Sequence, residues 1–245
     1  MEKIKIIILA AGKGTRMKSD LPKALAPLNR KPMIEHLRAS IAQVIEGKPI
    51  VVIGHQAELV KSTLGDNFIY VIQHEQLGTA HALLSAKDAC GDTERILVLY
   101  GDHPYVSAQT IKKLLKKSEE TGAVITMASS IIPDFENERK VFLNFAKIFR
   151  VNDEITGIRE KTDAIDQEQD AKEVNPGYYV FRSPWVWESL KKINKQNTQG
   201  EYYLTDLLKI AIQDGQKIES VLIEPREAMG ANSKEELDIL EKLEK

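Results

Sequence analysis

The chain has 245 residues, of which 42% are hydrophobic and 29% are charged, and its formal net charge is −2. This composition is ordinary for a soluble globular protein and gives no global electrostatic bias toward nucleic acid or a membrane surface. The single cysteine, Cys90, rules out an intramolecular disulfide and a cysteine-rich zinc site, and no segment approaches the ~20 apolar residues of a membrane span. We therefore expect a cytoplasmic protein with no nucleic-acid or membrane partner.

Apolar runs alternate with amphipathic helical patterns through the first half of the chain. In chain order, the patterns predict a strand at 4–9, a helix opening at Pro32, a strand at 50–53, a helix at 57–64, a strand at 68–72, a helix at 79–89, a strand at 96–100, a helix at 107–121 and a strand at 124–128. Continuous apolar strands that alternate with helices indicate an α/β fold, with a mixed, mostly parallel sheet covered by helices on both faces.

The second half has a different pattern. Two short β patterns between 147 and 158 flank Asn152-Asp153, which is typical of a hairpin turn, and the polar stretch 163–172 is predicted to be an exposed, mobile loop. The remaining expected elements are a strand at 178–181, helices at 185–193 and 204–213, a strand at 218–223 and a last helix behind a capping box at Ser233. We expect one domain over 1–245, with a substrate-facing lobe near 132–200.

The most informative stretch follows the first predicted strand. It is Leu9-Ala10-Ala11-Gly12-Lys13-Gly14-Thr15-Arg16-Met17, with Pro22-Lys23 just behind it. Its glycines allow a tight turn whose backbone N–H groups can bind an anion, and Arg16 and Lys23 add positive charge. The stretch is neither a dinucleotide fingerprint, because Met17 replaces the third glycine, nor a P-loop. It predicts a loop that holds a nucleoside triphosphate by its phosphates; for the glycines alone, a purely structural turn is the alternative.

The string L-A-A-G-x-G-T-R-M followed by P-K resembles the signature of the sugar-1-phosphate nucleotidyltransferases, or pyrophosphorylases. With Ser19 to Lys23 included, it is most similar to the uridylyltransferase domain of the bacterial bifunctional N-acetylglucosamine-1-phosphate uridylyltransferase/glucosamine-1-phosphate acetyltransferase. The resemblance covers nearly the whole chain and implies a Rossmann-like fold. It also implies that nucleotide-binding residues are Leu9, Ala10, Ala11, Gly12, Gly14, Thr15, Gln73, Gly78 and Thr79.

A carboxylate ends the fourth predicted strand, in Tyr100-Gly101-Asp102. Ligands of open α/β sheets bind beyond the carboxyl ends of strands, and a carboxylate there suits Mg²⁺; the alternative is an aspartate that caps the turn before Pro104. The family's Y-G-D-x-P-L motif, matched here except at Tyr105, carries the metal-binding aspartate and favours the first interpretation. His103 is expected to be a loop residue, because Mg²⁺ prefers oxygen ligands.

Asn232 stands where the family has its second Mg²⁺ ligand, just before the last helix. The alternative is turn chemistry before the Ser233 cap, which asparagine also serves. The resemblance therefore implies Mg²⁺ as the cofactor, held by Asp102 and Asn232.

A further block, Gln73 with Leu77-Gly78-Thr79-Ala80-His81-Ala82, resembles the family's Q-x-x-x-L-G-T-x-H-A. A glutamine amide can pair with both the acceptor and the donor of a uracil edge. Gly78 lets the backbone approach the base, and Thr79 opens a helix whose N-terminus can meet an anion; for both residues, a helix cap is the alternative. Thymine shares the uracil edge, so Gln73 does not choose between them. His81 is expected to position its neighbours.

The resemblance also implies a sugar-binding set, which is Tyr100, Gly101, Ala146, Glu160, Asn175 and Tyr203. The sequence departs from the family here, because Ala146 replaces a glycine, Asn175-Pro176-Gly177 replaces N-T-G, and Glu160-Lys161-Thr162-Asp163 has an extra residue. The stretch from Gly200 to Asp206 matches the family closely. We expect weaker discrimination for an N-acetyl sugar.

These observations predict a Mg²⁺-dependent enzyme that joins UTP to a hexose 1-phosphate and releases pyrophosphate. The first candidate for the acceptor is N-acetylglucosamine 1-phosphate, which would place the enzyme in cell-wall precursor biosynthesis. The attacking phosphate oxygen is already ionised, so the reaction needs charge neutralisation and alignment rather than a general base. The expected catalytic residues are Arg16, Lys23 and Asp102. Two rivals are an enzyme for another substrate pair, such as dTTP or glucose 1-phosphate, and a silent sugar-nucleotide-binding regulatory homologue.

The bifunctional relatives continue into a β-helix of hexapeptide repeats that transfers an acetyl group and forms trimers. The sequence up to Lys245 contains no such repeats. We therefore expect a monomer, or at most a weak dimer, without an acetyltransferase domain.

Overall fold

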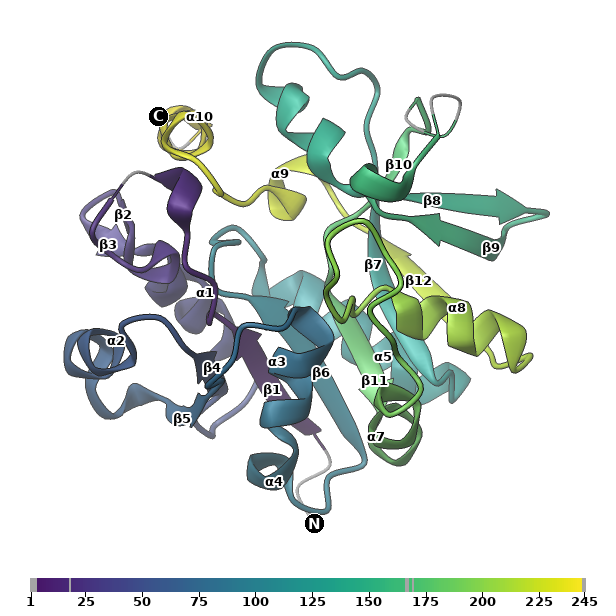
Figure 1. Cartoon of the computed structure of the whole chain (residues 1–245), viewed down its shortest axis with the longest axis horizontal. Coiled ribbons are helices and arrows are strands. Elements are labelled where there is room, and N and C mark those ends of the chain that lie inside the picture. Colours follow the sequence, from purple (N-terminus) through teal and green to yellow (C-terminus); the bar gives the residue numbers. More distant parts are fainter. Residues whose placement is uncertain (1–3, 18, 166–167, 169, 244–245) are drawn as a thin grey trace.

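A computed structural model of the chain describes residues 4–17, 19–165, 168 and 170–243. Its centre is a β-sheet with helices on both faces (Figure 1). The central strands lie in the order β5-β4-β1-β6-β11-β7, and β12 pairs with β7. Their bounds are β1 (Ile4–Leu9), β4 (Ile50–Ile53), β5 (Ile69–Ile72), β6 (Arg95–Tyr100), β7 (Ile125–Ile131), β11 (Tyr179–Arg182) and β12 (Ile218–Leu222).

The parallel part of this sheet determines where the following loops begin. β1 pairs with β4 and β6, and β4 pairs with β5, all in parallel. In register, Leu9 lies opposite Val52 on one side and Tyr100 on the other. Because the carboxyl ends of parallel strands meet at one edge, the segments after Leu9, Ile72 and Tyr100 begin at the same edge of the sheet.

The other part of the sheet is mixed. β11 runs antiparallel between β6 and β7, whereas β12 is parallel to β7, so the predicted mixed, mostly parallel central sheet is confirmed. Beyond β7, an antiparallel extension is formed by β10 (Glu173–Asn175), β8 (Ala146–Val151) and β9 (Glu154–Arg159). The predicted lobe at 132–200 includes this extension, but it also includes β11, which belongs to the central sheet.

Buried side chains form one cluster on each face of the sheet. One cluster includes residues of α1 (Met33–Ile41), α2 (Ala57–Leu64), α5 (Ala108–Thr121) and α10 (Lys234–Leu243). The other includes residues of α3 (Thr79–Ser85), α4 (Lys87–Cys90), α7 (Ser183–Leu190) and α8 (Asp206–Gln213). Along β1, Ile6 and Ile8 join the first cluster and Ile7 and Leu9 the second, which explains why this strand is apolar throughout.

Several elements differ from the sequence prediction. The expected helix at 79–89 is divided at Ala86, where the backbone N–H bonds to the carbonyl of Leu83 and tightens the last turn of α3. The chain also forms short elements that the patterns do not predict: β2 (Pro27–Leu28), β3 (Lys31–Pro32), α9 (Pro225–Ala228), and the 3-10 turns η1 (Thr15–Met17), η2 (Lys23–Leu25), η3 (Gly65–Asn67), η4 (Asn137–Asn144) and η5 (Lys161–Asp163).

Two local predictions concern the lobe. The hairpin turn at Asn152-Asp153 is confirmed, with φ values of 49° and 67° that suit a two-residue turn between twisted strands. Of the predicted loop at 163–172, residues 166, 167 and 169 lie outside the described residues. No helix in the described part of the chain is long and apolar enough to cross a membrane.

Candidate active site

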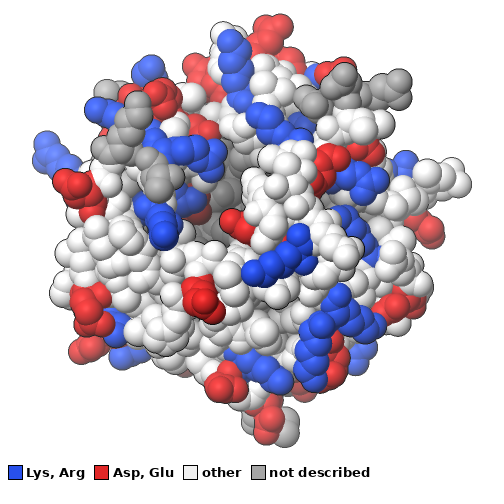
Figure 2. All heavy atoms as spheres, viewed as in Figure 1, with Lys and Arg blue, Asp and Glu red and all other residues white. Residues whose placement is uncertain are grey.

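Two adjoining cavities lie at the carboxyl edge of the parallel strands. The first has a volume of about 520 Å³ and the second about 340 Å³. Figure 2 shows the molecule hollowed near the middle of this face. Residues that line both cavities are Arg16, Lys23, Thr79, Tyr100, Asp102, Glu201 and Asn232. The two cavities are therefore two arms of one site with a shared, charged boundary.

The glycine-containing loop forms one wall of the first cavity. Its lining residues include the predicted Leu9, Ala10, Ala11, Gly12 and Gly14. Gly14 has a φ of 62°, and a side chain there would lie 3.0 Å from Cβ of Lys23, so both conformation and space favour glycine. Of Thr15, only the backbone is described, in η1.

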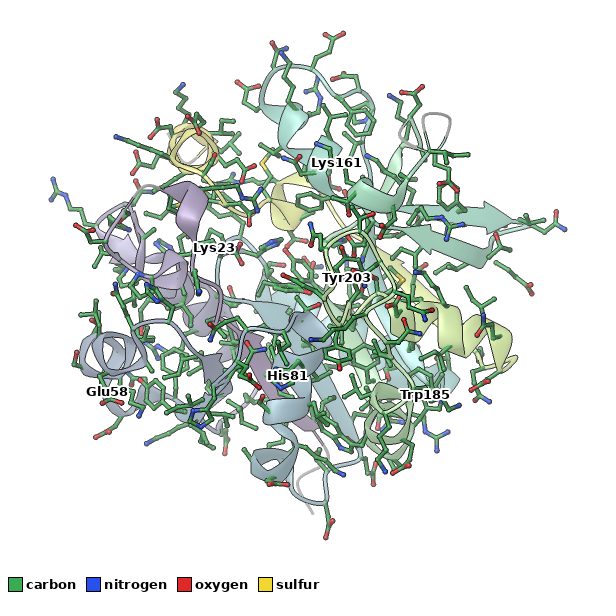
Figure 3. The ribbon with its side chains drawn as sticks, in the orientation of Figure 1. Lys23, Glu58, His81, Lys161, Trp185 and Tyr203 are labelled. Carbon is green, nitrogen blue, oxygen red and sulfur yellow. The ribbon has the colours of Figure 1, made fainter. Side chains whose placement is uncertain are left out.

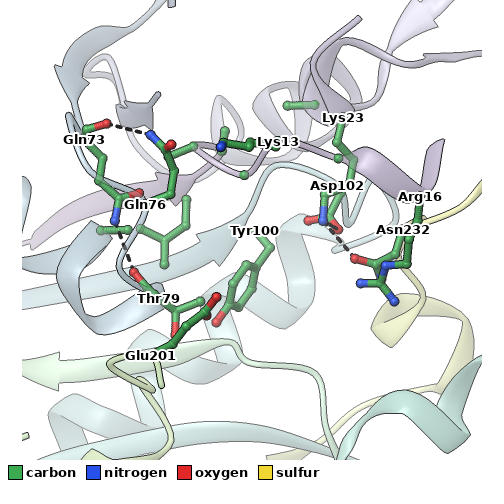
Figure 4. A pocket seen from close by; sticks show the side chains of 18 residues that line it. Lys13, Arg16, Lys23, Gln73, Gln76, Thr79, Tyr100, Asp102, Glu201 and Asn232 are labelled. Atoms are coloured by element: carbon green, nitrogen blue, oxygen red, sulfur yellow. Dashed lines mark hydrogen bonds and ion pairs between the residues drawn. The ribbon is translucent and has the colours of Figure 1, made fainter. Parts of the chain in front are cut away.

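A cationic group joins two oxygen atoms at the boundary between the cavities. The Lys23 Nζ lies 2.6 Å from Oδ2 of Asp102 and donates a hydrogen bond of 2.9 Å to Oδ1 of Asn232 (Figure 4). The Asp102 side chain is only 5% exposed. Burial alone would raise the pKa of this carboxyl, but the Lys23 ammonium outweighs it and holds the pKa below its ordinary value. Asp102 is therefore described as an ionised carboxylate.

Backbone contacts hold Asp102 and Asn232 near each other. The Ala231 N–H donates to the carbonyl of Asp102 over 3.1 Å. This bond connects the loop that follows β6 to the segment before α10. The Asn232 N–H donates to Oε2 of Glu236, and the Glu236 N–H donates to Oγ of Ser233. The predicted capping box is thus formed, except that the glutamate accepts from Asn232 rather than from Ser233. Asn232 serves the helix start with its backbone and the site with its side chain.

His103 is hydrogen-bonded to a neighbouring tyrosine. Its Nδ1 is 2.7 Å from the hydroxyl of Tyr178, which donates its own proton to the carbonyl of Glu227. The Tyr178 hydroxyl therefore accepts, so Nδ1 of His103 carries the proton. Burial lowers the pKa of His103. This arrangement agrees with the expectation that His103 is a loop residue rather than a metal ligand.

The segment after β5 forms the opposite wall of the first cavity. Gln73 is 3% exposed, and its Nε2 donates to the carbonyl of Gly78 over 3.2 Å and pairs with Nδ1 of His81 over 3.0 Å. The amide nitrogen expected to contact a base is therefore bonded within the protein. Gln76, which the sequence analysis did not select, also lines this wall and donates to the backbone carbonyl of Gln73.

Gly78 has a structural role that its neighbours explain. Its φ is 115°, and a side chain there would collide with the backbone of Tyr202. The Tyr202 N–H donates to the carbonyl of Leu77, and the Ala80 N–H donates to the carbonyl of Tyr202. The close approach that glycine permits is thus made by another part of this chain. Thr79 lines both cavities, and its hydroxyl accepts from the N–H of Leu204.

The second cavity contains the predicted sugar-binding residues, with one exception. Its lining includes Tyr100, Ala146, Glu160, Asn175 and Tyr203. Gly101 differs, because a side chain on it would meet Cβ of Ala10 at 3.1 Å and Cβ of Ala24 at 3.2 Å. Gly101 therefore packs beneath the glycine-containing loop. Lys23 and Tyr203, which both line this cavity, are labelled in Figure 3.

Two polar side chains of the second cavity, Glu160 and Asn175, are bonded to the protein. Oε1 of Glu160 accepts from the hydroxyl of Thr205 over 2.8 Å, and burial raises the pKa of this carboxyl. Nδ2 of Asn175 donates to the hydroxyl of Tyr179, while its Oδ1 accepts from the N–H of Gly177. Both atoms of the Asn175 amide are therefore used in holding the local chain.

The sequence analysis missed other lining residues. They are Lys13, Ala24, Gln76 and Ala82 in the first cavity, Asn144, Phe145, Gln199, Leu204 and Thr205 in the second, and Glu201 in both. Lys13 and Gln76 lie inside motifs that were quoted for their neighbours, so the motif itself was the available signal. Asn144 and Gln199 come from segments far apart in the sequence, and no local pattern distinguishes them.

The pair Asp102 and Asn232 fits a small hard cation. Their oxygen atoms already converge on one cationic nitrogen, Lys23 Nζ. Mg²⁺ is commonly bound by one or two protein oxygens together with substrate phosphates and water. Among the described residues, no cluster of three or more His, Cys, Asp or Glu side chains that could hold a metal is present. A Mg²⁺ site here would consequently depend on ligand phosphates for part of its coordination.

Comparisons with known proteins give the family. The sequence model of the MobA-like NTP transferase domain matches residues 6–201. The bifunctional protein GlmU of Desulfotalea psychrophila is 39% identical over 236 residues, which are 95% of this chain and 68% of that protein. The GlmU proteins of Brevibacillus brevis and Streptococcus agalactiae are 38% and 40% identical over 97% of this chain, which spans about half of their length (50% and 51%).

A solved structure supports the fold. It is a Bacillus anthracis protein named as a glucose-1-phosphate thymidylyltransferase and crystallised with sucrose. Its TM-score is 0.79 with 22% sequence identity, and the match covers 98% of this chain and 94% of the other. The chain therefore belongs to the MobA-like NTP transferase family, which confirms the nucleotidyltransferase family predicted from the motifs between Leu9 and Lys23.

Proposed function

We propose that this protein transfers a uridylyl group from UTP to a hexose 1-phosphate and releases pyrophosphate, with N-acetylglucosamine 1-phosphate as the first acceptor to test. The observation that carries this proposal is the Lys23–Asp102–Asn232 cluster at the boundary of the two cavities. A nucleotidyl transfer needs its charge-stabilising groups where two phosphorylated substrates meet. In this proposal, the first cavity binds the nucleotide and the second binds the sugar 1-phosphate.

Positive charge is concentrated where the phosphates would lie. Lys13, Arg16 and Lys23 line the first cavity, and the loop from Ala10 to Gly14 supplies its backbone. In the proposed complex, Gly12 and Gly14 let this backbone cradle the phosphates. Arg16 stabilises the negative charge that develops on the leaving pyrophosphate, and Lys23 neutralises the α-phosphate and the incoming phosphate.

Asp102 and Asn232 are the proposed Mg²⁺ ligands. Bound Mg²⁺ would supply further charge neutralisation on the reacting phosphates. The attacking oxygen belongs to a phosphate that is ionised near neutral pH, so the chain needs no general base. The proposed work of the protein is alignment: it holds the two substrates so that the attacking oxygen, the α-phosphorus and the leaving oxygen are in line.

The acceptor is the less constrained part of the proposal. Glu160, Tyr203 and the backbone near Gly177 line the second cavity, where carboxylate and hydroxyl groups suit the hydroxyls and amide of a sugar. The structural neighbour named for thymidylyl transfer to glucose 1-phosphate makes dTTP and glucose 1-phosphate the second substrate pair to test. We also propose that the chain acts as a monomer.

The direct experiment measures pyrophosphate release over a grid of nucleoside triphosphates and sugar 1-phosphates, with Mg²⁺ and with excess EDTA. We expect turnover with UTP and a hexose 1-phosphate, and none with EDTA. Turnover that survives EDTA would contradict the metal-dependent chemistry. UTP binding without turnover for any acceptor would instead indicate a sugar-nucleotide-binding regulatory homologue. Light scattering tests the monomer, and a stable trimer would contradict it.

A further inference from the structure

The hydrogen bonds around Gln73 determine which of its amide atoms a ligand can reach. Gln73 follows β5, and its backbone N–H donates to the carbonyl of Ile53 over 2.7 Å. Its backbone carbonyl accepts from Nε2 of Gln76 over 3.1 Å. Both backbone groups are therefore fixed, and the side chain extends from a rigid position toward the first cavity (Figure 4).

The carbonyl of Gly78 identifies which atom of the Gln73 amide faces it. A carbonyl oxygen only accepts hydrogen bonds, so the amide atom 3.2 Å from it must be the nitrogen. The opposite orientation would place two acceptor oxygens against each other. The second hydrogen of this nitrogen points to Nδ1 of His81, 3.0 Å away. Nδ1 must then accept, and the neutral imidazole carries its proton on Nε2.

Both hydrogens of the amide nitrogen are consequently used inside the protein. In the described part of the chain, no donor is recorded for Oε1 of Gln73, which leaves this oxygen as the group a ligand can pair with. An amide held in this way offers an acceptor and withholds its donors. It matches a nucleobase edge with an N–H, such as the imide of uracil or thymine. It opposes the unprotonated ring nitrogen of cytosine, because two acceptors would face each other.

We infer that His81 is a positioning residue for base selection: it holds the Gln73 amide with its oxygen toward the nucleotide, so that the site favours an imide base over cytosine. His81 lies on α3 (Figure 3) outside the lining of the first cavity, and it acts through Gln73 rather than by touching the base. Without His81, one amide hydrogen loses its acceptor and only the 3.2 Å bond to the Gly78 carbonyl still holds this orientation, so the amide rotates more readily to present its nitrogen. This inference rests on the proposed function, since it concerns the nucleotide of that same site.

The test compares UTP and CTP on two variants of His81. Leucine removes the acceptor, whereas asparagine can place Oδ1 close to the position of Nδ1 and so preserves the acceptor. We expect His81→Leu to reduce the UTP/CTP ratio of kcat/KM about tenfold, chiefly through the KM of UTP, with the KM of the sugar phosphate unchanged. His81→Asn should restore most of the ratio. His74→Leu is the matched control, because His74 is exposed and next to Gln73.

A double-mutant cycle shows whether His81 acts through Gln73. Calorimetric binding of UTP and CTP is measured for Gln73→Met, His81→Leu and the double variant. The inference requires that His81→Leu adds no further loss of UTP selectivity once the amide is gone. Additive losses would overturn it, as would an unchanged UTP/CTP ratio in His81→Leu or equal use of UTP and CTP by the wild type. If His81→Leu does not fold, His81→Asn and Gln73→Met still decide, since the first must keep selectivity and the second must lose it. Absence of nucleotide binding and of turnover in the wild type would overturn the proposed function itself.

Discussion

The two arms of the site are built from different parts of the fold. The first cavity is lined mainly by segments that directly follow β1, β5 and β6 within the first 102 residues. The second is lined by short stretches between Asn144 and Thr205, which come from the antiparallel extension and from loops. Parallel strands bring their loops together through register alone, whereas the second arm needs several distant segments to pack correctly.

The two arms also differ in charge. Lys13 lines only the first arm and Glu160 only the second, whereas Arg16, Lys23, Asp102 and Glu201 line both. In the second arm, the amide of Asn175 and the carboxyl of Glu160 are bonded to neighbouring side chains of the protein. We therefore expect substitutions in the two arms to affect different substrates, and substitutions at their boundary to affect both.

Asp102 lies at the boundary, and its replacement has the largest expected effect. Asp102→Asn keeps the shape but removes the negative charge that is proposed to hold Mg²⁺. We expect kcat to fall about 1,000-fold, because several kcal/mol of charge stabilisation would be lost. Pyrophosphate release measures the rate, and a thermal melt checks the fold. Asp88→Asn, at an exposed position, is the control. A rate within tenfold of the wild type would show that Asp102 is not a metal ligand.

The Lys23 ammonium lies between the two oxygen atoms that are proposed to bind Mg²⁺, so its replacement tests whether the ammonium and the metal share one position. Lys23→Met should lower kcat about 100-fold, because one phosphate-neutralising cation is lost. It should also lower the free energy of unfolding by about 3 kcal/mol in EDTA, since a buried carboxylate loses its partner. Mg²⁺ should recover more stability in this variant than in the wild type.

The measurement for Lys23 is a set of melts with and without Mg²⁺. Lys13→Met removes a lysine from the same cavity and should show the wild-type response to the metal. An identical Mg²⁺ effect in Lys23→Met and the wild type would mean that the ammonium and the metal do not share a position.

Glu160 tests whether the second arm selects the acceptor. Glu160→Gln should raise the KM of the sugar phosphate about tenfold and leave the KM of UTP unchanged. Because burial raises the pKa of Glu160 above its ordinary 4.5, the ionised carboxyl destabilises the folded protein at neutral pH. The variant should therefore melt at a higher temperature than the wild type at pH 7.5.

The stability difference should vanish in acid. As the pH falls through the raised pKa toward 4.5, the wild-type carboxyl becomes neutral and loses its disadvantage. Glu154→Gln changes an exposed glutamate of β9 and should show neither effect. If Glu160→Gln melts below the wild type at neutral pH, the carboxylate stabilises the fold and the argument from burial is wrong.

The smallest expected effect concerns the departures from the family. Ala146→Gly with Pro176→Thr adds room and one backbone N–H near the second cavity, which both residues line. We expect the kcat/KM ratio of N-acetylglucosamine 1-phosphate over glucose 1-phosphate to rise about two- to fivefold. A strong N-acetyl preference in the wild type, unchanged by the double substitution, would show that these residues are neutral.

Lining residues of both arms could be predicted from the sequence, and for the first arm the physical reason is the simpler one. Residues such as Gly12 and Asp102 directly follow apolar strands, so position in the chain is enough to bring them together. The contacts made by individual atoms were not predicted, because they depend on the folded chain. Gly101 packs against Ala24, and the Gln73 amide is bonded to His81. Sequence identifies a side chain that suits a ligand, but only the folded chain reveals which of its atoms are already bonded.

The bond between Lys23 and Asn232 joins residues that are 209 positions apart. Most of the chain must therefore be in place before the charged boundary of the site exists. Contacts with such long sequence separation carry a large loop-closure cost and form late in folding. A folding intermediate in which α10 has not docked would have its parallel strands and its glycine-containing loop, but it would lack the complete cluster. Competence for catalysis thus reports on completion of the fold, and a partly folded chain would not be expected to consume nucleotide.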